Sequence, residues 1–394
     1  MPNSEQILTS RLLQPGKETR IRQLSMPESR HRLDLKTLQA TSALRHAVSK
    51  GENRWFITYS GGKDSTTVIM LALELAKKGV VQPQQIDIVY ADTMLEIPPL
   101  RENAIDFLRY VVQFSKDHSL PVHCHVVQPN VDESFWFCLL GKGYPPPHQR
   151  FRWCTRRLKI QPARRLIDST TRTSGTCVIT GVRFNESKNR DHQLRLACRR
   201  GGECGQGLWY FYSRGLGMSY LAPIVDWTEC DVWDYLIFSS EGWPVEKLYR
   251  LYHSGENLRF GCWMCTVVRQ DRTMQKLTQR PELRHLTPLL KFRNWVVEVT
   301  SLSTNPDSRI LRNGCPRGLT LRVRKRLFDR LMKLQTEVGM DLISEKEEMA
   351  IREQWARHEG RWLNVLEPSE QFCDSLQCAT DEPATEQPTH LRIP

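Results

Sequence analysis

The chain has 394 residues, of which 40% are hydrophobic and 25% charged, and it contains no run of about 18 apolar residues; this balance is that of a soluble globular protein and argues against a membrane span. The N-terminus lacks the basic and then apolar layout of a secretory signal, so we expect a cytoplasmic protein with no membrane partner. The formal net charge of +12 favours a polyanionic partner such as a nucleic acid.

The first two thirds of the chain alternate between short apolar segments and helical patterns. A polar and basic helical arm is predicted over residues 1–45, followed by a nucleotide-binding domain over 46–255. Predicted strands cover residues 54–59, 86–91, 122–127 and 176–181, and predicted helices cover 66–78 and the segment from Pro98 to about Lys116. Strands that alternate with helices predict an α/β fold with a parallel sheet.

From about Leu258 the pattern becomes helical, which predicts a helical C-terminal domain over residues 256–366. One helix of this region carries an apolar stripe formed by Leu327, Phe328, Leu331 and Leu334. Residues 367–394 are rich in Thr, Glu, Gln and Pro, and we expect them to form a disordered tail.

A glycine-rich loop connects the first predicted strand to the first predicted helix. It consists of Ser60, Gly61, Gly62, Lys63, Asp64, Ser65 and Thr66. The glycines let backbone N–H groups approach phosphate oxygens, and the helix N-terminus adds the positive end of a dipole. We expect Lys63 to be exposed and to neutralise phosphate charge, the hydroxyls to donate hydrogen bonds, and Asp64 to position Mg²⁺.

The loop follows neither the G-x-x-x-x-G-K-[ST] nor the G-x-G-x-x-G pattern. It resembles the PP-loop of ATP pyrophosphatases, enzymes that cleave ATP between the α and β phosphates and form an adenylated intermediate. In that resemblance, Lys63 and Mg²⁺ would stabilise the leaving pyrophosphate, chiefly by electrostatics.

Further segments resemble phosphoadenosine phosphosulfate reductase-like proteins. They are Ala91-Asp92-Thr93 and residues 153–159, 180–183, 223–228 and 231–233. Within that group the chain is most similar to the DndC-type sulfurtransferases of DNA phosphorothioation, on residues 141–145, 151–154 and 259–268. The resemblance covers residues 40 to 335 approximately, and it implies an adenine nucleotide α-hydrolase-like fold, ATP pyrophosphatase activity and sulfur transfer to DNA.

The 12 cysteines are many for a chain expected in a reducing compartment, where metal ligands and catalytic thiols are commoner than disulfides. Cys262 and Cys265 form a C-x-x-C, which by itself is compatible with zinc, an iron–sulfur cluster or redox chemistry. The sequence has no second C-x-x-C for a four-thiolate zinc site. The alternative reading is that Cys154 is a buried thiol and that the C-x-x-C packs a turn.

The segment around Cys154 resembles adenylyl-sulfate reductases, in which paired cysteines and a distant C-x-x-C hold a [4Fe–4S] cluster. The resemblance implies Cys154, Cys262 and Cys265 as iron–sulfur ligands, with Trp153 in place of the first paired cysteine. The fourth iron is either open and able to bind sulfide, or held by Cys198, Cys204 or Cys315.

Three further features are candidates for the site. Arg183 follows a strand and Gly181, so it would reach the α-phosphate or the adenylated intermediate, although a surface ion pair is an equal alternative. Asp92 ends the second strand and would bind metal or ribose, or cap a helix. A basic surface, the candidate path of a nucleic-acid backbone, contains Arg150, Arg152, Arg156, Arg157, Arg164 and Arg165.

The sequence therefore predicts an ATP-dependent sulfurtransferase that uses Mg²⁺ and a [4Fe–4S] cluster and inserts sulfur into the DNA backbone. The resemblance implies a cysteine desulfurase as sulfur donor and other subunits of a DNA modification complex as partners. One alternative is a reductase of phosphoadenylyl or adenylyl sulfate, against which the absence of a Glu-Cys-Gly-Leu-His segment counts. The other is a non-catalytic nucleic-acid-binding subunit, against which the intact loop at Lys63 counts.

Overall fold

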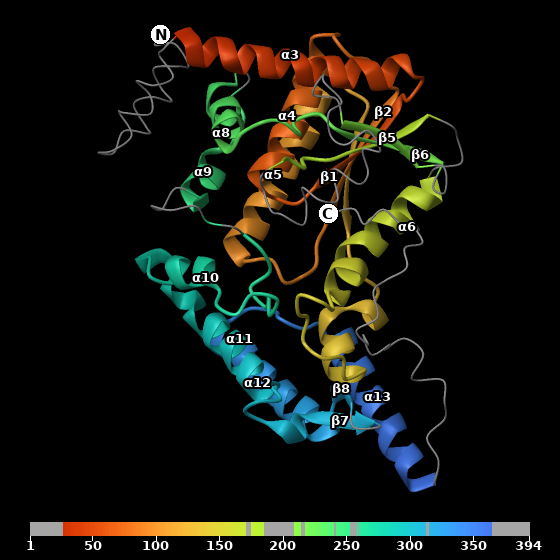
Figure 1. Cartoon of the computed structure of the whole chain (residues 1–394), viewed down its shortest axis with the longest axis vertical. Coiled ribbons are helices and arrows are strands. Elements are labelled where there is room, and N and C mark those ends of the chain that lie inside the picture. The colour runs from red at the N-terminus through yellow and green to blue at the C-terminus, as the bar shows by residue number, and fades with distance from the viewer. Residues whose placement is uncertain are drawn as a thin grey trace.

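A mostly parallel six-stranded sheet organises the N-terminal two thirds of the protein (Figure 1). The computed structural model describes residues 27–170, 175–184, 209–213, 217–239, 242–252, 258, 260–312 and 315–364. The strands are β1 (Arg54–Tyr59), β2 (Gln85–Ala91), β3 (Val122–Val127), β4 (Thr176–Ile179), β5 (Trp209–Ser213) and β6 (Met218–Ala222). Their order is β3-β2-β1-β4-β6-β5, and only β5 runs antiparallel to its neighbour. The predicted α/β fold with a parallel sheet is confirmed.

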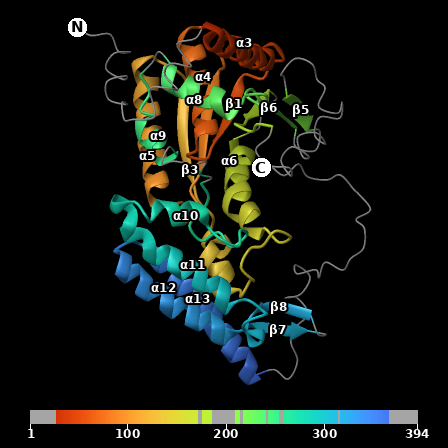
Figure 2. The same cartoon turned by 60° about the vertical axis from the view of Figure 1, so that its left-hand side comes forward.

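Helices cover both faces of this sheet, as expected when strands are buried on two sides (Figure 2). Helices α4 (Lys63–Lys77) and α5 (Pro98–Asp117) pack on one face, and α8 (Glu229–Phe238) packs outside them on α4. Helix α6 (Gln161–Thr170) packs on the other face. Strand alternation separates the two layers: Phe56 and Val178 face α6, whereas Ile57 belongs to the core on the α4 side.

The strand order reverses next to β1. The chain moves from β1 outward to β2 and β3, and then returns to place β4 on the other side of β1. In open α/β sheets the carboxyl ends of the two strands at such a reversal bound a crevice in which ligands bind. The loops after β1 and β4 therefore lie where a ligand is expected.

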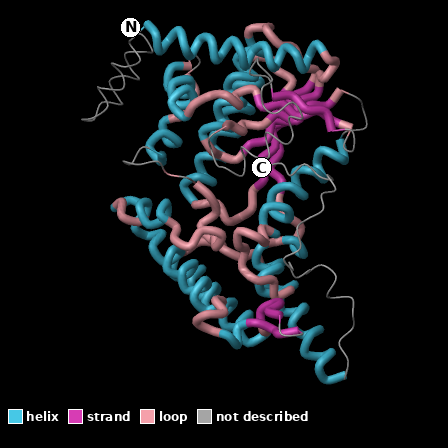
Figure 3. Tube along the Cα trace, viewed as in Figure 1, coloured by secondary structure: helices cyan, strands magenta, loops and turns pink. Residues whose placement is uncertain are grey.

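The C-terminal part is a layer of helices below the sheet (Figure 3). It contains α10 (Arg272–Leu277), α11 (Thr287–Val299), α12 (Leu321–Val338) and α13 (Glu345–Asn364). The predicted apolar stripe is buried on α12. The sequence did not predict the hairpin of β7 (Arg309–Arg312) and β8 (Cys315–Leu319), which interrupts the helices.

Residues 131–141 pack on these C-terminal helices, although the sequence assigns them to the nucleotide domain. The turn η2 (Phe137–Gly141) contacts α12 and α13. The indole of Trp136 donates to the carbonyl of Leu342, and the indole of Trp355 donates to that of Leu140. One continuous apolar core thus runs from the sheet into the helical layer.

Part of the predicted N-terminal arm is the helix α3 (Pro27–Ser49), which packs on α4 and α8. Residues 1–26 of the arm and the predicted tail lie outside the described residues. Among the described helices, none is both long and apolar enough to cross a membrane.

Candidate functional site

The predicted phosphate loop connects β1 to α4. Gly61 has a φ of +74°, and a Cβ there would lie 3.0 Å from the Cβ of Ala104, so the tight turn requires glycine. Helix α4 begins at Lys63, and its N-cap residue Gly62 provides no side-chain cap. The first N–H groups of α4 are therefore available to an anion at the positive end of the helix dipole.

The hydroxyl groups of the loop brace its backbone. Ser65 Oγ and Thr66 Oγ1 both donate to the carbonyl of Gly62, at 3.0 and 2.9 Å. The N–H of Ser60 donates to Ser65 Oγ at 3.2 Å. These bonds hold the loop in one conformation before any ligand binds.

Lys63 was predicted to be exposed, and this prediction is wrong: only 9% of the residue is accessible. Its ammonium group lies 3.3 Å from Asp64 Oδ2 and 3.6 Å from Glu229 Oε1. It also lies 5.2 Å from the ring centre of Tyr252. Two carboxylates and an aromatic face thus surround the cation, because α8 and α9 (Glu246–Tyr252) pack close to the loop. Glu229 and Tyr252 are site residues that the sequence analysis missed.

Arg183 forms a buried ion pair, not the surface pair considered above. The residue is 5% exposed, and its Nε donates to Asp64 Oδ1 at 2.5 Å. Its Nη1 donates to the carbonyl of Trp227 at 3.1 Å. The pair joins the loop after β4 to the start of α4, across the predicted crevice.

Gly181 makes this approach possible. A Cβ at this position would lie 2.8 Å from the carbonyl carbon and oxygen of Asp64 and from the amide nitrogen of Ser65. Those atoms are backbone and cannot move aside easily. Gly181 is therefore required for the close contact between its loop and the start of α4, and its predicted contact with the nucleotide stays a prediction.

Asp92 is completely buried just after β2. Arg101 Nη2 donates to its Oδ2 at 2.7 Å, Gln128 Nε2 donates to the same oxygen at 3.1 Å, and the N–H of Met94 donates to Oδ1. Burial alone would raise the pKa of Asp92, but the hydrogen bonds from Arg101 and Gln128 outweigh burial and lower it. The N-cap of α5 is Ile97, so Asp92 anchors α5 through Arg101 instead of capping it.

The C-x-x-C lies beside the loop that follows β2. The N–H of Trp263 donates to the carbonyl of Leu95 at 2.9 Å, and Cys262 forms a β-bridge with Glu96. Cys154 immediately precedes the helical turn η3 (Thr155–Ile160). The fold thereby brings the cysteine segment close to the carboxyl edge of the sheet. There it pairs with the loop that contains Asp92.

The three cysteines influence one another. The hydrogen bond from Cys262 lowers the pKa of Cys265 to about 6, helped by the N–H groups of Val267 and Val268. The same hydrogen bond, together with burial, raises the pKa of Cys262. Burial and the nearby Cys265 raise the pKa of Cys154. The pair thus favours ionisation of Cys265 over that of Cys262 and Cys154.

In the part of the chain that the structure describes, no group of three or more His, Cys, Asp or Glu side chains is arranged to hold a metal ion. Of the proposed fourth ligands, Cys198 and Cys204 lie outside the described residues, and Cys315 begins β8. The ligand set therefore stays a prediction.

Arg293 of α11 supports the cysteine loop, a role that no sequence signal indicated. The residue is 1% exposed. Its Nε donates to the carbonyl of Cys265 at 2.9 Å, its Nη1 to that of Arg269 at 3.0 Å, and its Nη2 to that of Val268. A buried cation thus fixes the backbone next to the Cys265 thiolate.

The predicted basic surface divides into two parts. Arg164 pairs with Asp168 at 3.2 Å, Arg165 pairs with Glu133 at 2.5 Å, and Arg157 donates to the hydroxyl of Tyr144. The exposed residues Arg150, Arg152 and Arg156 form no ion pair with any described carboxylate.

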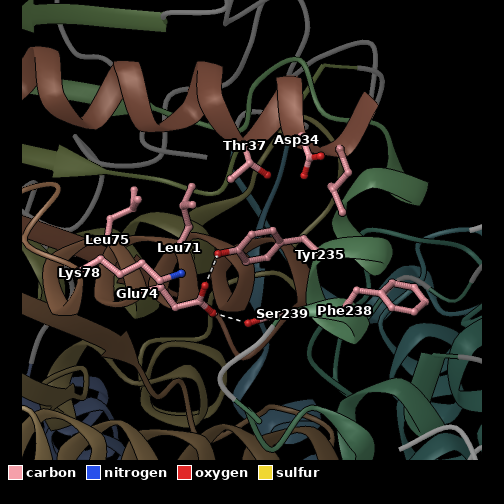
Figure 4. Close-up of a pocket in the computed structure, with 10 residues that line it drawn as sticks. Asp34, Thr37, Leu71, Glu74, Leu75, Lys78, Tyr235, Phe238 and Ser239 are labelled. Carbon is pink, nitrogen blue, oxygen red and sulfur yellow. Dashed lines mark hydrogen bonds between the residues drawn. The ribbon is translucent and has the colours of Figure 1, made fainter. Parts of the chain in front are cut away.

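A buried carboxylate positions α8 and hence Glu229 (Figure 4). Glu74 of α4 accepts hydrogen bonds from the hydroxyls of Tyr235 and Ser239 and from the indole of Trp243. It lines a cavity of about 230 Å³ between α3, α4 and α8 that also contains Lys78. This cavity adjoins the C-terminal half of α4, so it is separate from the phosphate loop at the other end.

Comparison with known proteins places the chain in a family. A phosphoadenosine phosphosulfate reductase domain matches residues 54–268. An uncharacterized protein of Methanocaldococcus jannaschii is 24% identical over 245 residues, which are 62% of this chain and 42% of that protein. This chain therefore spans well under half of the length of that relative.

Two solved structures show weaker similarity. Phosphoadenylyl-sulfate reductase from Candida auris, in a phosphate complex, is 18% identical with a TM-score of 0.36, over 58% of this chain and 90% of that one. FMN adenylyltransferase from Candida glabrata, with FAD and inorganic pyrophosphate, is 12% identical with a TM-score of 0.31. The match covers 77% of this chain and 88% of that one. The family match is the stronger finding, because it spans more than half of the chain and includes the phosphate loop, Asp92, Arg183 and the three cysteines. The chain belongs to the phosphoadenosine phosphosulfate reductase domain family.

Proposed function

We propose that this protein activates a nucleic-acid backbone with ATP and transfers sulfur to it, in the manner of DNA phosphorothioation. The observation that carries the proposal is the proximity of two kinds of chemistry. The loop from Asp92 to Glu96 connects the carboxyl edge of the sheet, where Lys63 and Arg183 lie, to the cysteine segment at Cys262. In this proposal, an adenylated substrate at the first site would receive sulfur from the second site along this loop.

At the nucleotide site, the chain supplies positive charge for phosphates. The free N–H groups at the start of α4 and the ammonium of Lys63 would bind the leaving pyrophosphate. Arg183 would remain paired with Asp64 and hold it in place. Carboxylate oxygens of Asp64 and Glu229 lie on either side of the Lys63 ammonium, so their chemistry fits a Mg²⁺ ion that enters with ATP.

At the cysteine site, the residue types are those that bind a metal group through thiolates. Cys154, Cys262 and Cys265 are soft ligands, and the hydrogen bond from Cys262 lowers the pKa of Cys265, which favours the thiolate that binds metal. These three residues would hold a [4Fe–4S] cluster, whose chemistry when bound is to carry sulfide for transfer. Arg293 would hold the ligand loop, and Trp263 would shield it from water.

Loss of Lys63 tests the nucleotide part. Lys63→Ala should reduce pyrophosphate release from ATP, in the presence of the substrate, by about 10²-fold or more, because it removes a main charge stabiliser. Lys78→Ala is the control, because Lys78 caps the C-terminal end of the same helix and lines the separate cavity. Since Lys63 is buried, thermal melting must show that the variant is folded. Normal pyrophosphate release by folded Lys63→Ala would refute the assignment.

Metal analysis tests the cysteine part. Protein purified without oxygen should contain about four irons per chain. Each of Cys154→Ser, Cys262→Ser and Cys265→Ser should lose the iron, because serine is a poor ligand for iron–sulfide cores. Cys138→Ser is the control, since this buried cysteine lies in η2. Stoichiometric zinc without iron would make the site structural.

The family match also favours a second candidate, reduction of phosphoadenylyl or adenylyl sulfate. The two candidates differ in product. Sulfite released from a sulfonucleotide and a reductant would support the reductase, whereas pyrophosphate released from ATP only when DNA is added would support sulfur transfer. The cysteine desulfurase and the other complex subunits remain part of the proposal on resemblance alone.

A further inference from the structure

The basic surface near Cys154 contains two groups of arginines: some are paired with carboxylates, and others form no ion pair within the described residues. Arg164 and Arg165 lie on α6, and each already has a carboxylate partner, Asp168 and Glu133. The carboxylates cancel part of the local positive charge, so this part of the surface attracts a polyanion less strongly than unpaired arginines would. The sequence alone could not distinguish these residues from their neighbours.

The segment just before α6 is different. Arg150 occupies the tip of a tight turn that is closed by two hydrogen bonds between His148 and Phe151. Arg152 and Arg156 lie two residues before and two residues after Cys154. All three arginines are exposed, and none has an ion pair within the described residues.

This turn is held rigidly beside the cysteine segment. Thr266, the residue after Cys265, donates its hydroxyl to the carbonyl of Pro147 at 2.7 Å. Trp153 is buried and donates its indole N–H to the carbonyl of Pro145 at 2.9 Å. A ligand on the three arginines would therefore occupy a fixed position relative to the thiols.

Arg309 adds a further positive charge near this turn. Arg309 of β7 lies near enough to His148 for it and Arg150 to lower the pKa of that imidazole, after the larger effect of burial. Burial also lowers the pKa of Arg309 to about 10. Its Nη2 donates to the carbonyl of Thr300, but its buried Nη1 has no hydrogen-bond partner among the residues that the structure describes. A buried guanidinium group without a carboxylate favours an anion nearby.

We propose that a nucleic-acid backbone crosses the protein over Arg150, Arg152 and Arg156, beside the cysteine segment, and not over the face of α6 that carries Arg164 and Arg165. Uncompensated cations spread along a surface suit a polymeric anion, which gains from the release of several counterions at once. The inference rests on the nucleic-acid substrate of the proposed function and adds where that substrate lies.

The experiment compares two variants of the full-length protein. One carries Gln in place of Arg150, Arg152 and Arg156, and the other carries Gln in place of Arg164 and Arg165. Fluorescence anisotropy would measure binding to labelled single-stranded DNA, duplex DNA and RNA of one sequence, between about 50 and 200 mM salt. The slope of log K against log salt should decrease by about 2 to 3 in the triple variant and by less than about 1 in the double variant.

Lysines at positions 150, 152 and 156 should restore binding, which separates loss of charge from a folding defect. Equal losses in the two Gln variants, or no loss in the triple variant, would overturn the proposed path. ATP binding by the wild-type protein is measured in the same preparations. Absence of ATP binding would refute the proposed function, whereas ATP binding without nucleic-acid binding would refute this inference alone.

Discussion

The guanidinium of Arg183 and the carboxylate of Asp64 form a buried ion pair, with Nε 2.5 Å from Oδ1, between residues that lie 119 positions apart. Asp64 belongs to the first turn of α4, and Arg183 follows β4. Their contact joins the two sides of the crevice at the reversal of strand order. It also places a second cation at the phosphate loop, in addition to Lys63.

A double-mutant cycle should measure this pair. Asp64→Asn and Arg183→Gln should each lower the free energy of unfolding by about 2 kcal/mol or more, since each leaves a buried partner incompletely satisfied. The double variant should lose less than the sum, by about 1 to 3 kcal/mol, in urea denaturation. Additive losses would show that the two residues do not interact.

Gly181→Ala should disturb the phosphate loop from the opposite side of the crevice. The added methyl group would lie 2.8 Å from backbone atoms of Asp64 and Ser65, so the loops must separate. We expect a loss of stability of about 1 to 3 kcal/mol together with weaker ATP binding. Gly261→Ala is the matched control, because a Cβ there meets nothing within 4 Å. Equal melting temperatures for the two variants would contradict the close approach.

Arg101→Gln should change how stability depends on pH. In the folded protein the pKa of Asp92 is below the ordinary aspartate value of 3.8, so the pair stabilises the fold above that pH and loses its effect as pH falls through the folded pKa. The free energy of unfolding of the variant should therefore be lower at pH 7 by about 1 to 3 kcal/mol. The loss is smaller than for a fully buried pair, because Arg101 is partly exposed and solvent weakens the interaction.

Without Arg101, burial should raise the pKa of Asp92, and the difference between wild type and variant should shrink in acid. Urea denaturation from pH 7 down to pH 3 would measure it. Arg109→Gln, which removes a surface pair with Asp106, is the control. A difference that stays constant with pH would show that Arg101 acts by packing alone.

In metal-free protein, alkylation of Cys265 should begin at a lower pH than alkylation of Cys124 or Cys138. Because its pKa is lowered to about 6, the thiolate forms as pH rises through 6, and the rate should level off above pH 7. Burial raises the pKa of Cys138 to about 11 and that of Cys124 to about 12, so both should stay unreactive at pH 8. Mass spectrometry after brief iodoacetamide treatment would measure each site. A midpoint above pH 8 for Cys265 would refute the thiolate.

Local patterns made several features predictable from the sequence. The strand, glycine pair and helix around Lys63 are contiguous, so their hydrogen bonds and dipole follow from a few consecutive residues. The apolar stripe of α12 was predictable because helical periodicity determines which side chains are buried. The hairpin of β7 and β8 was missed, since its strands are short and lie between strongly helical segments.

The sequence by itself determined the family, the α/β class and the identity of the phosphate loop, because these depend on residue type and local spacing. Only the tertiary structure decided which charges meet. It buried Lys63 beside Asp64 and Glu229, paired Arg183 with Asp64, and paired Arg164 and Arg165 with carboxylates, whereas Arg150 forms no ion pair with any residue that the structure describes. The physical reason is that electrostatic interactions act over a few ångströms in space, whatever the separation along the chain.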